Sequence, residues 1–128
     1  MKNGEQPRAI QDRTFDFAVR IVKLSLHLDG RRGTAKVLSP QILRAGTSIG
    51  ANVEEAQGGQ SKADFISKMS IALKEARETH FRLRVLAAAE VLPDKQLAPL
   101  IKEADEIQRI IGAIVVSAKG GGNGGNEK

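Results

Sequence analysis

Several residue types that often carry chemistry are missing from this chain or scarce in it. Its 128 residues include no cysteine, no tryptophan and no tyrosine. They include only four phenylalanines and two histidines. Without cysteine there is no disulfide framework, no thiolate metal site and no thiol nucleophile. With so few aromatic rings, we do not expect unpaired bases to stack on an aromatic platform.

Recognisable catalytic and metal-binding constellations are also missing. Many four-helix bundles hold two metals through paired Glu-x-x-His motifs, and neither histidine here follows a glutamate at that spacing. The adjacent acids Glu54-Glu55 and Asp105-Glu106 would point about 100° apart on a helix, so neither pair easily shares a metal or a proton. We therefore expect no enzyme activity, no metal site and no cofactor.

Long apolar runs are lacking as well. The longest, residues 110–116 with Gly112 inside it, falls far short of the roughly 20 residues that span a bilayer. The N-terminal sequence MKNGEQPRAIQDR contains no apolar run typical of a signal peptide. These absences predict a cytoplasmic protein, and the lack of cysteine fits a reducing compartment.

Positive charge, in contrast, is abundant and concentrated. The formal net charge is +5, and residues 13–37, with six basic and two acidic side chains, contribute +4 of it. Such a patch, repeated in an oligomer, attracts nucleic-acid phosphates; in a monomer the simpler interpretation is a solvated face. The predicted nucleic-acid-binding residues are Arg20, Lys23, His27, Arg31, Arg32 and Lys36.

Apolar periodicity and turn residues predict one domain of four helices. Ser39-Pro40 is expected to start the second helix and Gly58-Gly59 to end it, and Ser61 to cap the third. The expected helices cover residues 13–28, 40–57, 62–91 and 95–118. The bundle domain is then 13–119, with flexible segments at 1–12 and in the Gly-rich tail at 120–128.

The first helix carries two apolar stripes on opposite faces. One consists of Phe15, Ala18, Val19, Val22 and Leu26, and the other of Phe17, Ile21, Leu24 and Leu28. A helix of a simple four-helix bundle needs one apolar face, so we assign the first stripe to the core and the second to a contact between subunits. The alternative is a helix buried on both sides within its own subunit.

Two further features bear on packing. In the third helix, Phe81 and Val85 point away from the core stripe and are either subunit contacts or isolated surface residues. In the second, Gly46 and Gly50 each cost about 1 kcal/mol in a helix interior, which predicts a neighbouring backbone that comes close. Asn52 lies beside the apolar stripe and is expected to be hydrogen-bonded between helices rather than to a ligand.

The most specific sequence patterns are S-I-x-x-N-x-x-E, from Ser48 to Glu55, and K-E-x-x-E-T, from Lys74 to Thr79. With the surrounding segments 41–55, 64–66 and 71–79, they resemble the four-helix bundle proteins encoded in intervening sequences of bacterial 23S ribosomal RNA genes. The resemblance covers residues 15–118. Ala56 stands where that family often has glycine, and His80-Phe81 where it often has an aromatic pair.

The resemblance implies an all-α, left-handed, up-down-up-down bundle that forms a homopentamer, with Gly46, Gly50, Asn52 and Glu55 in structural roles. Similar proteins are accessory factors of diversity-generating retroelements, in which a basic pentamer binds RNA or DNA and a partner reverse transcriptase. We therefore expect a non-enzymatic oligomer that binds nucleic-acid backbone with low sequence specificity. The alternative is a scaffold protein that binds an acidic protein partner.

A third hypothesis concerns Arg20 and His27. Their spacing resembles the Arg-x(4 to 6)-His motif of the prokaryotic and eukaryotic nucleotide-binding ribonuclease superfamily, although Ile21 stands where a polar residue is usual. In that setting histidine is the general acid or base, and arginine holds the scissile phosphate. We rank this metal-independent ribonuclease below the two binding functions.

Overall fold

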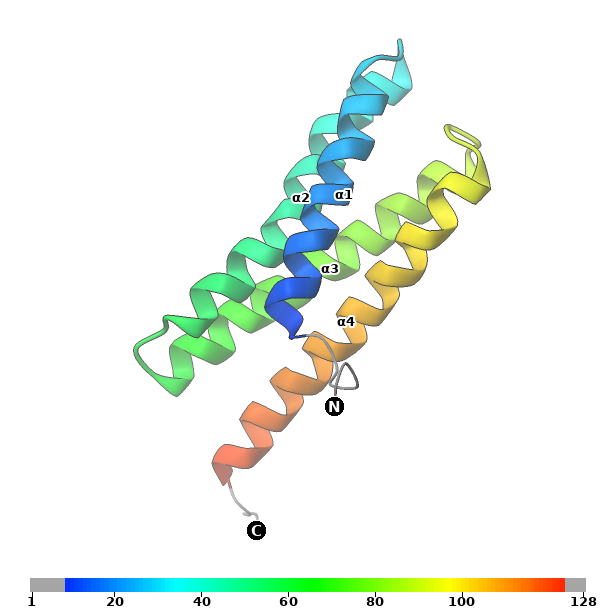
Figure 1. The fold of residues 1–128 in the computed structure, drawn as a ribbon. Helices are drawn as coiled ribbons and strands as arrows, with labels where there is room; N and C mark the ends of the chain where they lie inside the picture. Colours follow the sequence, from blue (N-terminus) through cyan, green and yellow to red (C-terminus); the bar gives the residue numbers. More distant parts are fainter. Residues whose placement is uncertain (1–8, 124–128) are drawn as a thin grey trace.

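Four α-helices form the part of the chain that the computed structural model describes, residues 9–123. The helices are α1 (Ile10–Asp29), α2 (Thr34–Gln57), α3 (Lys62–Ala88) and α4 (Asp94–Asn123). The α1–α2 and α3–α4 connections lie at one end of the molecule and the α2–α3 connection lies at the other (Figure 1). The predicted all-α fold of four helices is thereby confirmed.

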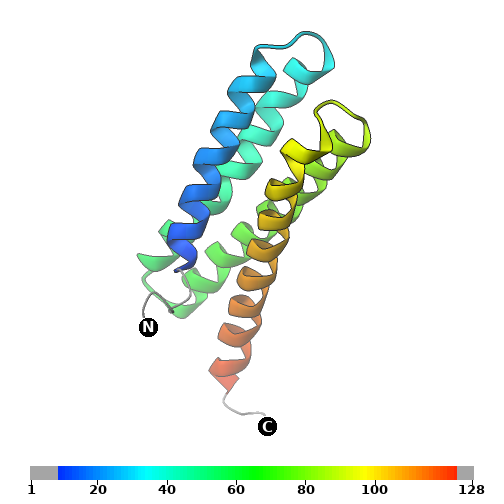
Figure 2. The ribbon, with the colours of Figure 1, turned by 45° about the vertical axis from the view of Figure 1, so that its right-hand side comes forward.

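Each helix contributes one apolar stripe to a shared core. Helices α1 and α2 lie side by side as one antiparallel pair, and α3 and α4 form the second pair (Figure 2). The largest buried side chains are Phe17, Ile21, Leu28, Ile42, Ile49, Met69, Leu83, Leu97, Ile107 and Ile111. Burying a side chain of this size contributes about 1.5–3 kcal/mol, so this core is the main favourable contribution to folding. Within the described residues no helix is long and apolar enough to cross a bilayer.

The structure corrects our assignment of the two stripes on α1. The stripe that we predicted to contact another subunit lies in the core of its own subunit, at most 9% exposed; its members are Phe17, Ile21, Leu24 and Leu28. The stripe that we predicted for the core faces outward, and four of its members are 39–65% exposed. We call these four residues the α1 seam: Phe15, Val19, Val22 and Leu26.

The contact between α1 and α2 explains which stripe is buried. A Cβ atom on Gly46 would lie 2.7 Å from Ile21 Cγ2, and a Cβ atom on Gly50 would lie 3.2 Å from the backbone oxygen of Thr14. The predicted close approach of a neighbouring backbone is therefore confirmed at Gly50, whereas at Gly46 the close neighbour is the Ile21 side chain. The stripe that contains Ile21 packs against the notch at Gly46, so the opposite stripe faces outward.

The start of α2 also differs from our prediction. The helix begins at Thr34, and Pro40 lies inside it. The Ser39 hydroxyl is not free to cap a helix, because it is buried and lies 2.6 Å from the Ser25 hydroxyl of α1. The connection between α1 and α2 is consequently only residues 30–33, with Gly33 in a left-handed conformation at φ 69°.

The other helix boundaries are close to the predicted ones. The Ser61 hydroxyl accepts a hydrogen bond from the Asp64 N–H at 3.1 Å and caps α3 as expected. That helix ends at Ala88 rather than near Val91, and Glu90 follows it with φ 58°. Helix α1 begins at residue 10, inside the N-terminal segment predicted to be flexible, and α4 ends at residue 123, inside the tail predicted to be flexible. The rest of these two segments, residues 1–8 and 124–128, lies outside the described part.

Replacing Gly46 by Ala tests the α1–α2 notch. The new methyl group meets the buried Ile21 side chain, and we expect Gly46→Ala to lower the free energy of unfolding by about 1–3 kcal/mol. Gly112→Ala is the matched control, because its Cβ would lie 3.9 Å from Leu73 Cδ1, an ordinary contact. The control should gain about 0.5–1 kcal/mol from helix propensity. If urea unfolding gave the same change in the free energy of unfolding for both variants, the close contact between Gly46 and Ile21 would be contradicted.

Candidate nucleic-acid interface

The predicted cations of α1 share one exposed strip of the helix. Arg20, Lys23 and His27 are all exposed and follow one another at spacings of three and four residues, which places them on one face. None of them makes an ion pair within the described part of the chain. We call these three residues the α1 cation strip, after Arg20 and Lys23, which carry its positive charge.

The α1 cation strip forms one wall of an open groove between α1 and α4. The groove has a volume of about 450 Å³, and Gln96 and Pro99 of α4 line its other wall. Largely buried leucines complete the lining: Leu24, Leu92 and Leu100. Sequence reasoning missed the α4 wall, because nothing in the local pattern near Gln96 indicates that α1 lies opposite.

An ion-pair cluster joins α1 to α4 closer to the N-terminal end of α1. Arg13 Nη2 donates to Glu103 Oε1 at 2.6 Å and to Glu106 Oε1 at 2.7 Å. Hydrogen bonds to Glu103 and then to Glu106 raise the pKa of Arg13 above its ordinary value, so the guanidinium stays charged at any physiological pH. The cluster thus holds α1 against α4 beyond one end of the groove.

The remaining predicted cations do not line this groove. Arg31 and Arg32 lie in the α1–α2 connection, and Lys36 lies in the first turn of α2; all three are exposed. Arg31 lines a separate depression together with the acids Glu90 and Asp94. The structure therefore brings together three of the six predicted residues and places Arg31 where acidic side chains compete with a phosphate.

Two exposed apolar patches lie outside the groove. The α1 seam follows a spacing of four, three and four residues beside the α1 cation strip. On α3, Phe81 and Val85 are 56% and 40% exposed, and the Arg84 guanidinium carbon lies 5.8 Å from the centre of the Phe81 ring. Their role in subunit contacts stays a prediction.

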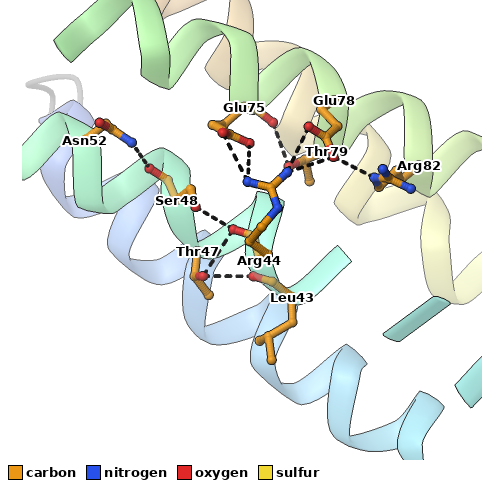
Figure 3. Close-up of polar contacts among 9 residues, drawn as sticks. All are labelled: Leu43, Arg44, Thr47, Ser48, Asn52, Glu75, Glu78, Thr79 and Arg82. Atoms are coloured by element: carbon orange, nitrogen blue, oxygen red, sulfur yellow. Dashed lines mark hydrogen bonds and ion pairs between the residues drawn. The ribbon is translucent and has the colours of Figure 1, made fainter. Parts of the chain in front are cut away.

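Residues of the K-E-x-x-E-T motif hold α3 against α2. Arg44 Nη1 donates to both Glu75 carboxylate oxygens at 3.2 Å, and its Nη2 donates to both Glu78 oxygens at 2.9 Å (Figure 3). Arg82 Nε donates to Glu78 at 2.8 Å. The hydrogen bond from Arg82, followed by that from Arg44, lowers the pKa of Glu78. The glutamates of the motif are thus acceptors in a structural cluster.

The outcome for Asn52 corrects one expectation. Its Nδ2 donates to the backbone oxygen of Ser48 at 2.9 Å, so it is bonded within α2 and not between helices (Figure 3). The residue is half-buried, and the preceding turn of its own helix supplies this partner. Glu55, three residues after Asn52 in the same motif, instead makes a contact between helices, because it pairs with Lys68 of α3 at 3.0 Å.

His80 lies outside the groove, half-buried on α3. Burial lowers its pKa first, the positive charge of Arg84 lowers it further, and Asp105 of α4 acts in the opposite direction. Within the described residues, no three His, Asp or Glu side chains gather in a group suited to a metal ion.

Comparison with known proteins places the chain in a family. The family model of the 23S rRNA-intervening sequence protein matches residues 8–113. The chain belongs to this family. A crystal structure of a protein of unknown function from the S23 ribosomal protein family of Bacteroides thetaiotaomicron is 41% identical to it, with a TM-score of 0.77. The alignment covers 84% of this chain and 98% of that one.

No curated protein matches the chain. For this member of the 23S rRNA-intervening sequence protein family, the comparisons confirm the family that the motifs indicated. The family match includes α1, α2, α3 and most of α4, and the similar crystal structure is of a protein of unknown function.

A pH titration of stability tests the environment of His80. Because folding lowers the pKa of His80 below its ordinary 6.5, the folded state favours the neutral ring. The resulting stability is present above pH 6.5 and is lost as the pH falls through the folded-state pKa. We expect urea unfolding to show this loss as the pH falls below 6.5, and His80→Gln to remove it.

Arg84→Gln is the matched variant for this measurement. It deletes the charge that helps to lower the pKa of His80 and leaves burial in place, so the loss of stability should shrink without vanishing. Parallel pH profiles of the wild type and His80→Gln would show that His80 is not the group responsible.

Proposed function

We propose that this protein is a non-enzymatic homo-oligomer that binds the phosphate backbone of RNA or DNA. The observation that carries the proposal is the contrast between paired and unpaired cations. Arg13 and Arg44 are each held by two glutamates, whereas the α1 cation strip has no ion-pair partner within the described residues. Exposed cations without such a partner attract phosphates, at an affinity that falls steeply with salt.

The chemistry of the strip supports low sequence specificity. Contacts to phosphates position a protein on a nucleic acid, and sequence is read by contacts to base edges. Arginine and lysine side chains on one exposed helix face supply the first kind of contact. We therefore expect similar affinities for different sequences of equal length.

The exposed apolar patches support self-association. The spacing of the α1 seam is typical of helices that pack along one another, and Phe81 with Val85 forms a second patch on α3. Two different patches on one subunit favour a head-to-tail contact, which closes into a ring when the rotation between subunits allows it. The family resemblance supports a homopentamer, in which five copies of the α1 cation strip act together.

Within the cell we propose a role as an accessory factor of a nucleic-acid-processing protein such as a reverse transcriptase, on the strength of the resemblance. The alternative is a scaffold whose cations bind an acidic protein. The ribonuclease hypothesis has one observation in its favour, since Arg20 and His27 line the same groove. His27 is seven positions after Arg20, so their Cα atoms lie about 10.5 Å apart along the helix axis. This distance is large for two groups that act on one phosphodiester.

A charge-removal variant tests backbone binding. We expect Arg20→Ala, Lys23→Ala, Arg31→Ala and Arg32→Ala in combination to abolish retention of random-sequence RNA in a low-salt filter-binding assay. In the corresponding single-alanine variants, each lost phosphate contact should reduce the slope of log affinity against log salt by about 0.7–0.9.

The matched control removes four positive charges from exposed positions elsewhere, at Lys62, Lys74, Arg77 and Lys119. It has the same net charge, so retained binding by the control separates a localised surface from general attraction. Unchanged retention by the first variant would discard the proposal, and an acidic protein partner would then be the better hypothesis. Recovered RNA should be intact; shortening that disappears in His27→Ala would favour the ribonuclease instead.

Leu26→Asp tests the α1 seam as a subunit contact. Leu26 is 65% exposed in the subunit, so the fold should survive, as judged by circular dichroism, while sedimentation velocity should show a shift to smaller species. Val116→Asp on α4 is the control, because that side chain is 71% exposed and lies outside the seam. If the wild-type chain sediments as a monomer at micromolar concentration, the proposal of a homo-oligomer is wrong.

A further inference from the structure

The groove between α1 and α4 has a mixed chemistry that a phosphate-binding surface alone does not require. Its α1 wall carries the α1 cation strip, and its α4 wall presents Gln96 and the ring of Pro99. Leu24, Leu92 and Leu100 lie beneath them. No acid among the described residues lines the groove, so its charge is positive and its other surface is largely apolar.

We propose that this groove binds a segment of single-stranded nucleic acid, with phosphates on Arg20 and Lys23 and base faces against Pro99 and Leu100. The proposal deepens the backbone-binding function above and rests on it. At about 450 Å³, the groove falls within the range of roughly 300–1,000 Å³ that is typical of sites for small ligands. It therefore fits about one or two nucleotide units of a longer strand.

The apolar part of the groove's α4 side, formed by Pro99 and Leu100, is the reason to prefer a single strand to a duplex. We call it the apolar wall. A duplex keeps its base faces stacked inside, so it offers only phosphates and sugars to a groove of this size. A single strand has bases that unstack and lie on a protein surface. Only the single strand uses the cationic wall and the apolar wall together.

The groove stays open when the α1 seam is covered. Leu24 lines the groove and Leu26 belongs to the seam, and two residues correspond to about 200° around a helix. Leu24, on the floor of the groove, therefore lies nearly opposite the seam on α1, and the α1 cation strip lies between the two, beside the seam. A neighbouring subunit on the seam would leave the Leu24 side of the groove open to a strand and would border the α1 cation strip.

The contrast between single strand and duplex gives the first test. A surface that contacts only phosphates favours duplex, because duplex has the higher charge density. If the groove holds a strand, fluorescence anisotropy at low salt should show tighter binding of a short oligothymidylate or oligouridylate than of a duplex of equal length. Tighter binding of the duplex would overturn the proposal. Comparison of the two oligomers tells whether the strand is DNA, RNA or either.

Gln96→Glu gives the second test, because it places a negative charge on the wall opposite Arg20 and Lys23. We expect it to weaken single-strand binding about five- to tenfold. The matched control is Gln60→Glu, which makes the same change at an exposed position in the α2–α3 connection, at the other end of the bundle. Equal, small effects of the two variants would show that the strand does not enter the groove.

The outcomes separate the two proposals. If the four-alanine variant of the α1 and α1–α2 cations loses binding while Gln96→Glu behaves like Gln60→Glu, backbone binding stands and the groove proposal fails. If the wild type binds neither oligonucleotide nor duplex, both fail together. Circular dichroism and sedimentation of Gln96→Glu should match the wild type, since Gln96 is exposed and lies outside the core.

Discussion

The close contact between α1 and α2 determines which surface the molecule presents. Ile21 fits against Gly46, where any side chain would collide with it, and the backbone of Thr14 fits against Gly50. The buried hydroxyls of Ser25 and Ser39 add a hydrogen bond between the same helices. Together these contacts fix the rotation of α1 about its own axis. Every exposed feature of α1, both the seam and the cation strip, follows from that rotation.

This constraint also explains the main error of the sequence interpretation. The two stripes of α1 are similar in length and hydrophobicity, so periodicity alone cannot say which one faces inward. The deciding information lies in a different helix, at Gly46 and Gly50. Their presence correctly predicted a close approach, but the residue that fills the notch depends on how α1 and α2 are aligned. That alignment is a tertiary property, and no pattern within α1 contains it.

The number and order of helices were predictable because α1, α2 and α4 have a strong apolar period, α3 has a weaker one, and most helices have clear end signals. Pro40 was misleading for a physical reason. A proline usually marks a helix start, because it lacks the N–H group that an interior position uses. Here the preceding Ser39 is engaged with Ser25 in the α1–α2 interface, so packing outweighs the local preference and α2 begins earlier, at Thr34.

The candidate site was predictable only in part, because whether a cation is free depends on acids far away in the chain. Glu75 and Glu78 serve the α2–α3 contact through Arg44, and two glutamates of α4 serve the contact with Arg13. These glutamates are therefore used in ion pairs between helices and do not neutralise the α1 cation strip. Beyond the Arg13 cluster, toward the connections 30–33 and 89–93, the groove separates α1 from α4, and no acid of the described residues lines it. The packing that commits the acids to helix contacts thus leaves the α1 cation strip facing an open groove with an apolar wall.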